Sequence, residues 1–506
     1  MTLIITLAFL AVALIGMPLF MMFGASAMYL FNQDQGGTIT SVAIDVFSEK
    51  FADSPQLVTI PLFTIAGYLM AEGGTPRRLI KFSRAVFGWM PGGLAVVCLI
   101  TSAFFTTFTG GSGITIVAIG GLLFPALIQE NYPRQFSLGL VTTAGSLGIM
   151  FPPALPLILY GIVANILLDK LFLAGLLPGI LTVIATCVYS AFIGVKSNVP
   201  RTKFDRKVAW EAIKETKWEI GLPVVIVGGL ASGLLRVHEA SAFTGLYVLF
   251  IETFIYRELD VRRDLPRIIR ESMTLVGAIL AILSTAIGFT SYLVQAQVPM
   301  RVLEAMQTLI TSKTMFLLVL NVFCLLAGMV MEIFAAIFVV VPLIVPIAKH
   351  FAVDPYHLAI TFLVNLEIAY LAPPLGLNLI ISSFRFNVPV TNVYRSVLPF
   401  IAVLGVTLVI TTYVPWLSTF LPSLSKTADL SPADTGAAPA PDQGEPGGVG
   451  LDELEEDAPS LEDLDDVNLE DFDTKPAQPG EQPAAPDTAP TPAPDTAPTP
   501  APAPAP

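Results

Sequence analysis

A long uncharged apolar run constrains the fold of this chain more than any other feature. From Gly92 to Ile128 no residue carries a charge, and further apolar stretches precede and follow it. A helix of about 20 apolar residues is long enough to span a bilayer. Only 13% of the residues are charged, whereas a soluble domain has about 25%. The sequence therefore predicts an all-α polytopic membrane protein that has the lipid bilayer as its surroundings.

Two of the apolar stretches have an awkward length. Residues 92–128 and 315–348 are each too long for one span of about 20 residues and short for two spans with a loop. Each also has small residues near its middle, and the first has Thr109–Gly113 there. We expect two re-entrant hairpins, while two full spans in each stretch remain an alternative. The expected stretches are 3–31, 57–71, 92–128, 136–165, 171–195, 220–236, 239–256, 271–295, 315–348, 357–383 and 396–421.

Two other stretches carry a Pro-Pro pair near their centres, at 152–153 and 373–374. Proline removes a backbone donor and keeps the residue before it out of helical geometry. Glycines flank both pairs, so each stretch is expected to be a broken helix. Unwound backbone is tolerated at membrane depth only where it lines a cavity or is buried in protein.

The basic residues predict the orientation in the membrane. The segments 72–91, 129–135, 196–219, 257–270 and 384–395 share one side and hold 19 of the 27 Lys and Arg residues. An excess of positive charge marks the cytoplasmic side. We therefore expect a cytoplasmic N-terminus and a periplasmic C-terminal tail.

The same layout contains an internal repeat. Residues 57–195 (repeat A) and 271–421 (repeat B) each contain a span, a hairpin, a broken helix and a final span. The two sets start on opposite sides of the membrane, and 3–31 and 220–256 are left as scaffold spans. Inverted repeats with matching broken helices are typical of secondary transporters, whose site lies where the breaks meet.

The breaks offer ligand groups without formal charge. Glycine lets backbone carbonyls and amides approach a ligand closely, and Thr109 and Ser112 add hydroxyl oxygens. Carbonyls at helix C-termini suit a small cation such as Na⁺, and amides at helix N-termini suit a carboxylate. The alternative is that the glycines only permit close helix packing, which we favour for Gly120-Gly121.

Two acids fall inside apolar stretches, Glu332 in the second hairpin and Glu367 before the second Pro-Pro pair. Ionisable groups at membrane depth are costly and often functional. Glu332 has two interpretations, capture of a cation or proton, and capping of the hairpin's second arm. The cysteines and histidines form no metal-ligand pattern, and no nucleophile–base pair is visible among the spans. We expect neither an enzyme nor a cofactor, nor a nucleic-acid partner.

The C-terminal part is acidic. Residues 427–506 hold 19 of the 40 Asp and Glu residues and end in an Ala-Pro run, whereas residues 1–426 carry a net charge of +5. Such a composition cannot bury a core. We expect a transmembrane permease domain at 1–426 and a disordered tail at 427–506. The leucines in the tail could also form a short amphipathic helix that docks on a partner, and this hypothesis stays open beside the disordered tail.

Taken together, several motifs resemble the large permease subunit of tripartite ATP-independent periplasmic (TRAP) transporters, of the DctM-like type. They include "IPLFTIAGYLM" (60–70), the tip at 109–113, "GSLGIMFPPALPLILYG" (145–161), "LFLAGLLPGIL" (171–181), "GMVMEIFAAIFVVVPLIVPIA" (328–348) and "LEIAYLAPPLGLNLI" (366–380). The resemblance covers about residues 1–422.

The resemblance implies an inverted-repeat, elevator-type secondary transporter in the bacterial inner membrane that couples Na⁺ entry to import of organic acids. It implies two protein partners, a small four-span membrane subunit and a periplasmic substrate-binding protein. The implied cation-binding residues are Thr109, Gly110, Ser112, Gly113, Gly145, Ser146, Gly148, Gly328, Glu332 and Ala372. The implied substrate-binding residues are Gly111, Pro152, Pro153, Pro373, Pro374, Gly376 and Asn378.

The chain departs from the family pattern at the breaks. Ala154 stands where Ser is usual, Ala372 where Thr is frequent and Ala369 where Gly is frequent. Fewer hydroxyl groups therefore surround the second cation site. Two other hypotheses stay open, a stand-alone ion-coupled dicarboxylate or cation/proton exchanger, and a membrane scaffold that acts through its acidic tail.

Overall fold

The computed structural model describes residues 17–33, 55–199, 204–307, 310, 312–373 and 376–424, and the regular structure in these residues is helical throughout. Six helices are long and apolar enough to cross a membrane, or seven if the bent pair Gln56–Glu72 and Thr75–Phe87 is one span. The predicted all-α polytopic fold is therefore confirmed. The predicted tail at 427–506 and the start of the first apolar stretch lie outside the described residues.

The described residues form a series of helices. In chain order they are α2 (Leu19–Gln33), α4 (Thr59–Glu72), α5 (Thr75–Phe87), α6 (Gly93–Thr109), α7 (Ser112–Thr115), α8 (Gly121–Gln129), α9 (Arg134–Ala144), α10 (Leu155–Val163), α11 (Leu168–Lys196), α12 (Arg206–Glu215), α13 (Lys217–Ser232), α14 (Val237–Phe250), α15 (Leu265–Gln295), α16 (Val298–Gln307), α17 (Lys313–Val330), α18 (Ile333–His350), α19 (Pro355–Ala369), α20 (Leu377–Phe386), α21 (Val390–Tyr413) and α22 (Trp416–Leu424). Tighter or wider helical turns form η2 (Pro55–Val58), η3 (Ile116–Gly120) and η4 (Ile251–Ile255), of which η3 and η4 are π-helices.

The elements from α4 to α11 recur in the same order from α15 to α21. A first helix (α4 or α15) precedes a short amphipathic helix (α5 or α16) and two helical arms that pack together (α6 with α7 and η3, or α17 with α18). A helix interrupted at a Pro-Pro pair (α9/α10 or α19/α20) and a long helix (α11 or α21) complete each set. The predicted spans, hairpins and broken helices occur in this order, whereas the short helices α5 and α16 were not predicted.

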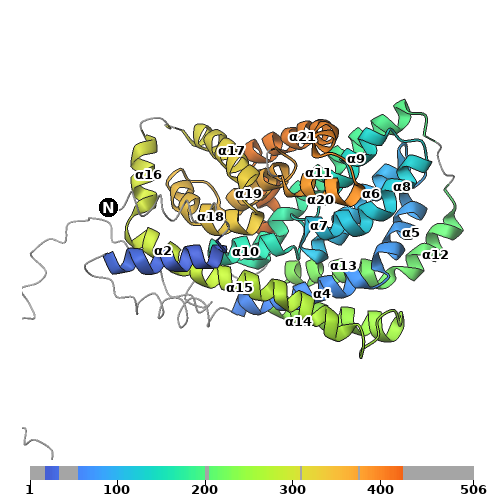
Figure 1. Cartoon of the computed structure of the whole chain (residues 1–506), viewed down its shortest axis with the longest axis horizontal. Coiled ribbons are helices and arrows are strands. Elements are labelled where there is room, and N and C mark those ends of the chain that lie inside the picture. The colour runs from blue at the N-terminus through green and yellow to red at the C-terminus, as the bar shows by residue number, and fades with distance from the viewer. Residues whose placement is uncertain are drawn as a thin grey trace, which may run out of the picture. The chain divides into compact units, whose positions relative to one another are not determined.

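Two groups of helices pack against each other (Figure 1). One is a row in which α2 contacts α15, α15 contacts α4, and α4 contacts α14. The other contains the hairpins, the broken helices and the long helices, in which α9 and α11 both pack against α21. Helix α4 also contacts α6 and α10, so the row lies directly against the first hairpin and the first break.

Burial separates central helices from peripheral ones. Every residue from Phe136 to Ala144 on α9 and from His357 to Ala369 on α19 is buried. A helix that is apolar on all sides is typical of such positions. Helices of the outer row instead expose large apolar side chains, for example Leu246, Phe250 and Phe254. An apolar exterior is suited to contact with lipid.

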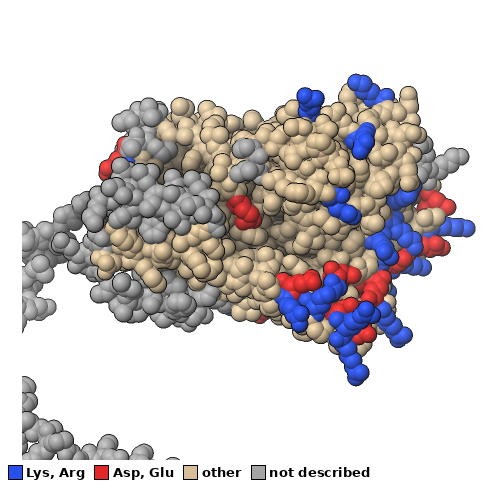
Figure 2. All heavy atoms as spheres, viewed as in Figure 1, with Lys and Arg blue, Asp and Glu red and all other residues tan. Residues whose placement is uncertain are grey.

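The segments that carry most basic residues contain helices that we expected to be connections. Residues 72–91 form α5, and 196–219 contain α12. Their alternating charged and apolar residues favour helices that lie along a surface. Figure 2 shows that most charged side chains visible on this face gather over α5, α12 and the start of α15, while the middle is largely uncharged apart from one acidic group. The basic segments of the sequence therefore lie together at one end of the helical body.

Candidate functional site

The tip of the first hairpin is a real interruption of the helix. Helix α6 ends at Thr109, and Gly110 adopts the left-handed conformation with φ of +63°. Gly111 is extended, and α7 begins at Ser112. A Cβ atom on Gly110 would lie 2.9 Å from Cβ of Leu155, the first residue of α10. Glycine is therefore required at this position by both the backbone and the contact with α10.

The first broken helix lies directly against this hairpin. Helix α9 ends at Ala144 and α10 begins at Leu155, so the Pro152-Pro153 pair belongs to an unwound stretch, as predicted. The hydroxyl of Thr106 lies 3.0 Å from the carbonyl of Gly145 and 2.7 Å from the hydroxyl of Thr115. Hydroxyl groups thus join both arms of the hairpin to the start of the break.

The glycines of the break pack closely against the hairpin. A Cβ on Gly145 would lie 2.9 Å from the carbonyl oxygen of Ser112, and one on Gly148 would collide with the carbonyl of Ala103. Ser146 donates from its hydroxyl to the carbonyl of Thr143 at 3.2 Å. These contacts show that close packing is one role of Gly145 and Gly148. They also bring the residues predicted for the first cation site together.

Two buried hydroxyl oxygens at this place have no hydrogen-bond partner among the described residues, those of Thr109 and Thr143. A buried polar atom without a partner carries a free-energy cost of about 1–3 kcal/mol. A dehydrated cation would accept coordination from such an oxygen and from the free carbonyls at the end of α6. The donors at the tip therefore fit a small cation, the chemistry that the sequence predicts.

The second hairpin turns at Met331 and Glu332, both extended, between α17 and α18. The Glu332 carboxylate accepts a hydrogen bond from the amide of Phe334 at 3.0 Å and one from the Tyr370 hydroxyl at 3.5 Å. That hydroxyl accepts in turn from the amide of Ile333 at 3.1 Å. Glu332 thus caps the N-terminus of α18, which is the second of the two roles considered for it. Its other role, capture of a cation or proton, stays a prediction.

The second broken helix ends at Ala369 and resumes at Leu377. A Cβ on Gly328, near the end of α17, would lie 2.6 Å from Cβ of Ala369. The structure therefore brings Gly328 to the stretch that contains Ala372 and Pro373. Gly376 immediately precedes α20, and Pro374 lies outside the described residues.

The two breaks meet through an exchange of half-helices. Helix α20, from the second break, packs against α7 and η3 of the first hairpin, and α10, from the first break, packs against α18 of the second. The buried Asn378 donates from Nδ2 to the carbonyl of Thr142 at 3.4 Å, and the Thr142 and Ser382 hydroxyls are 2.9 Å apart. The Oδ1 atom of Asn378 has no hydrogen-bond partner among the described residues. Convergent breaks are the arrangement that we expected from the Pro-Pro pairs.

A family model for the DctM component of tripartite ATP-independent periplasmic transporters matches residues 3–417. The chain belongs to this family. It is 31% identical to the C4-dicarboxylate TRAP transporter large permease protein DctM of Vibrio cholerae, over 81% of this chain and 95% of that protein. It is 34% identical to the isethionate TRAP transporter permease protein DctMQ of Oleidesulfovibrio alaskensis, over 80% of this chain and 64% of that protein.

A third relative of this DctM-type permease is the sialic acid TRAP transporter permease protein SiaT of Haemophilus influenzae, 30% identical over 83% of this chain and 68% of that protein. Among solved structures, the YdaH transporter of Alcanivorax borkumensis matches with a TM-score of 0.60 over 83% of this chain and 99% of that one. At 12% identity, that match supports the fold alone. The relatives are transport proteins, and this permease is a transport protein rather than an enzyme.

Sequence reasoning missed several polar residues of the permease site. Thr106, Thr115, Thr142, Ser382 and Tyr370 all take part in the contacts described above. The one available signal was a hydroxyl group inside an apolar stretch, and such residues are common in membrane helices because they bond to their own backbone. Their partners lie up to 240 residues away in the sequence.

A second buried polar network lies beside the second hairpin of the permease. Asn365 donates to Asn321 at 2.8 Å, and Asn321 donates to the hydroxyl of Thr412 at 3.0 Å. His357 contacts the Ser418 hydroxyl and the Thr412 carbonyl. These bonds join α17, α19, α21 and α22. Glu367 on the same α19 is buried, and neither of its carboxylate oxygens has a partner among the described residues.

Proposed function

We propose that this chain is the large membrane subunit of a TRAP transporter that imports organic anions, carboxylates in particular, with inward Na⁺ flow as the driving force. The observation that carries the proposal is the exchange of half-helices between two interrupted helices and two hairpins. In such an arrangement, helix N-termini with partial positive charge and helix C-termini with partial negative charge lie close together. The unpartnered hydroxyl of Thr109 supports a cation at the first tip.

The chemistry follows from backbone dipoles. The C-terminal end of α6 carries partial negative charge from free carbonyls, and the hydroxyl of Thr109 adds an oxygen ligand for Na⁺. The N-terminal ends of α10 and α20 carry partial positive charge that suits a carboxylate, although Pro156 removes one amide from the first turn of α10. A cation bound at the tip would hold Gly110–Ser112 in place and so favour binding of the anion nearby.

The substrate class is inferred from the relatives. Their names give C4-dicarboxylates, isethionate and sialic acid, which all carry a carboxylate or sulfonate group. We propose that this chain shares a small organic anion as substrate. Ala154 and Ala372 replace hydroxyl-bearing residues at the breaks, so the solute would rely more on backbone amides.

Membership in a three-component family makes partners part of the proposal. We infer a small four-span membrane subunit and a periplasmic binding protein that delivers the solute. The orientation with the N-terminus in the cytoplasm follows from the basic segments and belongs to the same proposal.

The test is reconstitution into liposomes with the candidate partners and an imposed Na⁺ gradient, with labelled succinate, isethionate and sialic acid supplied outside. We expect uptake of at least one acid that requires inward Na⁺ and both partners. Uptake that proceeds equally without the binding protein would favour the stand-alone exchanger. No Na⁺-dependent flux of any organic acid would contradict the proposal.

A further inference from the structure

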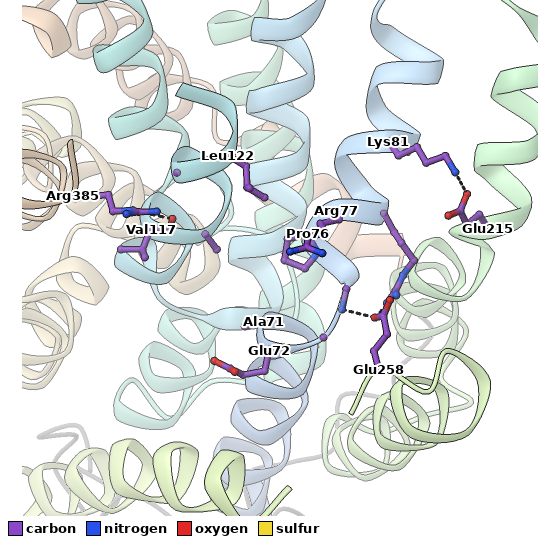
Figure 3. Close-up of a pocket in the computed structure, with 15 residues that line it drawn as sticks. Ala71, Glu72, Pro76, Arg77, Lys81, Val117, Leu122, Glu215, Glu258 and Arg385 are labelled. Atoms are coloured by element: carbon purple, nitrogen blue, oxygen red, sulfur yellow. Dashed lines mark hydrogen bonds and ion pairs between the residues drawn. The ribbon is translucent and has the colours of Figure 1, made fainter. Parts of the chain in front are cut away.

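An open cavity of about 730 Å³ lies between α5 and the second arm of the first hairpin. Gly74 and Arg77 line it from the start of α5, Val117 and Leu122 from η3 and α8, and Arg385 from α20 (Figure 3). Segments that are far apart in the sequence therefore form its walls, to which Glu72 of α4, Glu215 of α12 and Glu258 also contribute. The cavity lies at the charged end of the helical body, the side that the basic residues mark as cytoplasmic.

Most charged groups of the cavity are already paired. Lys81 forms an ion pair with Glu215 and Arg78 with Glu258, while Glu72 binds Arg267 at 2.6 Å. In contrast, Arg77 and Arg385 are exposed and have no acidic partner within the described part of the chain. Two arginines on different elements therefore line the same open cavity without an acidic partner among the described residues.

The side chain of Arg385 is oriented by a hydrogen bond and by the space beside a glycine. Its Nε donates to the carbonyl of Val117 at 3.3 Å, and Val117 belongs to the π-helix η3. A Cβ on Gly121 would collide with the Arg385 guanidinium, so the absence of a side chain at Gly121 makes room for it. Short π-helical segments are frequent at functional sites. The other N–H groups of Arg385 remain available for a ligand. Arginine binds carboxylates through two parallel hydrogen bonds, so these groups suit an anion.

The cavity is connected to the breaks by two helices. Asn378 lies at the second break, and Arg385 follows it seven residues later on α20, two turns along the same face and about 10 Å further along the axis. On the first hairpin, Gly113 at the tip is followed by Val117 one turn later. A Cβ on Gly113 would lie 2.7 Å from Cδ1 of Ile381, so the two helices are in contact.

We propose that this cavity is a second anion site on the cytoplasmic side, where Arg385 and Arg77 bind the carboxylate or sulfonate group of the solute after it leaves the breaks. The inference rests on the proposed function and deepens it, because it assigns to the same solute a second binding site on its way to the cytoplasm. Arg385 receives the anion on the α20 side, and Arg77 on the α5 side. The site favours anions over neutral solutes at the exit.

A cysteine reporter measures the charge of the cavity without knowledge of the natural substrate. Leu122 lines the cavity and is 47% exposed, so Leu122→Cys is placed in the full chain after Cys98, Cys187 and Cys324 are changed to alanine. The rates of modification by anionic sulfonatoethyl and cationic trimethylammonioethyl methanethiosulfonate are measured in phosphatidylcholine nanodiscs. We expect the ratio of anionic to cationic rate to fall at least about tenfold when Arg385→Gln and Arg77→Gln are combined.

Arg84→Gln is the matched control. Arg84 lies on the same α5, is exposed, pairs with Glu130 at 2.8 Å and does not line the cavity. It removes one charge, and we expect it to leave the ratio within about twofold of the parent, because solvent and salt screen a charge outside the cavity. The neutral reagent methyl methanethiosulfonate should still modify Leu122→Cys in all variants, with at most a few-fold change from the altered thiolate fraction, which shows that the cavity is intact. An unchanged ratio in the double variant with an unchanged neutral rate would overturn the proposal.

Competition identifies the anion. Succinate or isethionate at millimolar concentration should slow modification of Leu122→Cys by the neutral reagent in the parent and not in the double variant. If the arginines alter the ratio only when phosphatidylglycerol is added to the nanodiscs, they bind a lipid phosphate and the proposal is wrong. Failure of Na⁺-driven uptake in liposomes, with protection by these acids preserved, would remove the proposed coupling and leave the anion site standing.

Discussion

At the residue scale, the unpaired atoms separate ligand groups from structural ones. Thr106 and Thr109 lie on the same α6, Thr109 as its last residue and Thr106 about one turn before it. Thr106 contacts Gly145 and Thr115, whereas the Thr109 hydroxyl has no partner among the described residues. A buried hydroxyl that forms several contacts stabilises the fold, and we propose that the Thr109 hydroxyl, which forms none and lies at the hairpin tip, is a cation ligand.

Thr109→Val should therefore weaken Na⁺ binding without destabilising the protein. We expect the Na⁺ concentration for half-maximal uptake to rise about tenfold, which corresponds to about 1.4 kcal/mol, while the Tm stays within about 2 °C of the parent. Thr106→Val, the structural counterpart, should lower the Tm by several degrees because it removes bonds to Gly145 and Thr115. Equal Tm losses in the two variants would argue against a ligand role for Thr109.

Gly110→Ala tests the left-handed turn of the tip. A non-glycine residue at φ of +63° costs about 1–2 kcal/mol, and the added Cβ would press on Leu155. We expect the Na⁺-dependent uptake rate to fall at least about tenfold while the protein still reaches the membrane. Gly228→Ala is the control, because nothing lies within 4 Å of a Cβ there, and it should transport normally. Full transport by Gly110→Ala would show that the tip tolerates another conformation.

At the element scale, local patterns predicted the interruptions and not the surface helices. Small residues at Thr109–Gly113 and the Pro-Pro pairs act on their own backbone, so the sequence predicted that these stretches are interrupted. The structure ends α9 at Ala144 and α19 at Ala369, several residues before the Pro-Pro pairs. Helix α5 was expected to be a connection, because residues 72–91 are a basic segment between two apolar stretches. Its position depends on Arg78, whose partners lie 141 to 180 residues away and are invisible to a local pattern.

The Arg78 cluster fixes α5 to the scaffold helices. The side chain of Arg78 is 7% exposed and pairs with Glu219 on α13, with Glu252 on η4 at 2.7 Å, and with Glu258. Its guanidinium also lies 3.6 Å from the ring centre of Tyr256. One buried cation therefore joins the bend between α4 and α5 to three acids that follow much later in the sequence.

Arg78→Met should destabilise the permease strongly, because it leaves buried carboxylates without a counter-charge. Removing one partner of such a cluster costs about 3–5 kcal/mol, so we expect a fall in Tm of roughly 5 °C or more. Arg84→Met on the same helix removes an exposed partner of Glu130 and should change the Tm by less than about 2 °C. Thermal unfolding in nanodiscs measures both. Similar Tm values for the two variants would show that the cluster does not anchor α5.

At the scale of the whole molecule, the fold is two sets of elements that exchange half-helices. The sequence predicted the order of both sets, because a hairpin, a Pro-Pro break and a long span are each visible in apolar length and composition. It could not predict that Asn378 reaches Thr142 or that Arg385 reaches Val117, because both pairs depend on how the sets pack.

Removal of residues 427–506 separates transport from a scaffold role. The described helices end at Leu424, and the contacts of both hairpins and both breaks lie before it. We expect the truncated protein to retain at least about half of the parental Na⁺-dependent uptake in liposomes. Loss of all function with normal membrane insertion would instead favour a protein that acts through its acidic tail.

The central claim is that the two breaks together hold an organic anion and its driving Na⁺ through backbone dipoles and a few hydroxyl groups. A cryo-EM structure of the full complex in Na⁺ with its transported acid tests this most directly. We predict a cation peak coordinated by the Thr109 hydroxyl and carbonyls of the first tip and break, which disappears when choline replaces Na⁺. Continuous helices through Pro152 or Pro373, or a solute bound away from both breaks, would contradict the account.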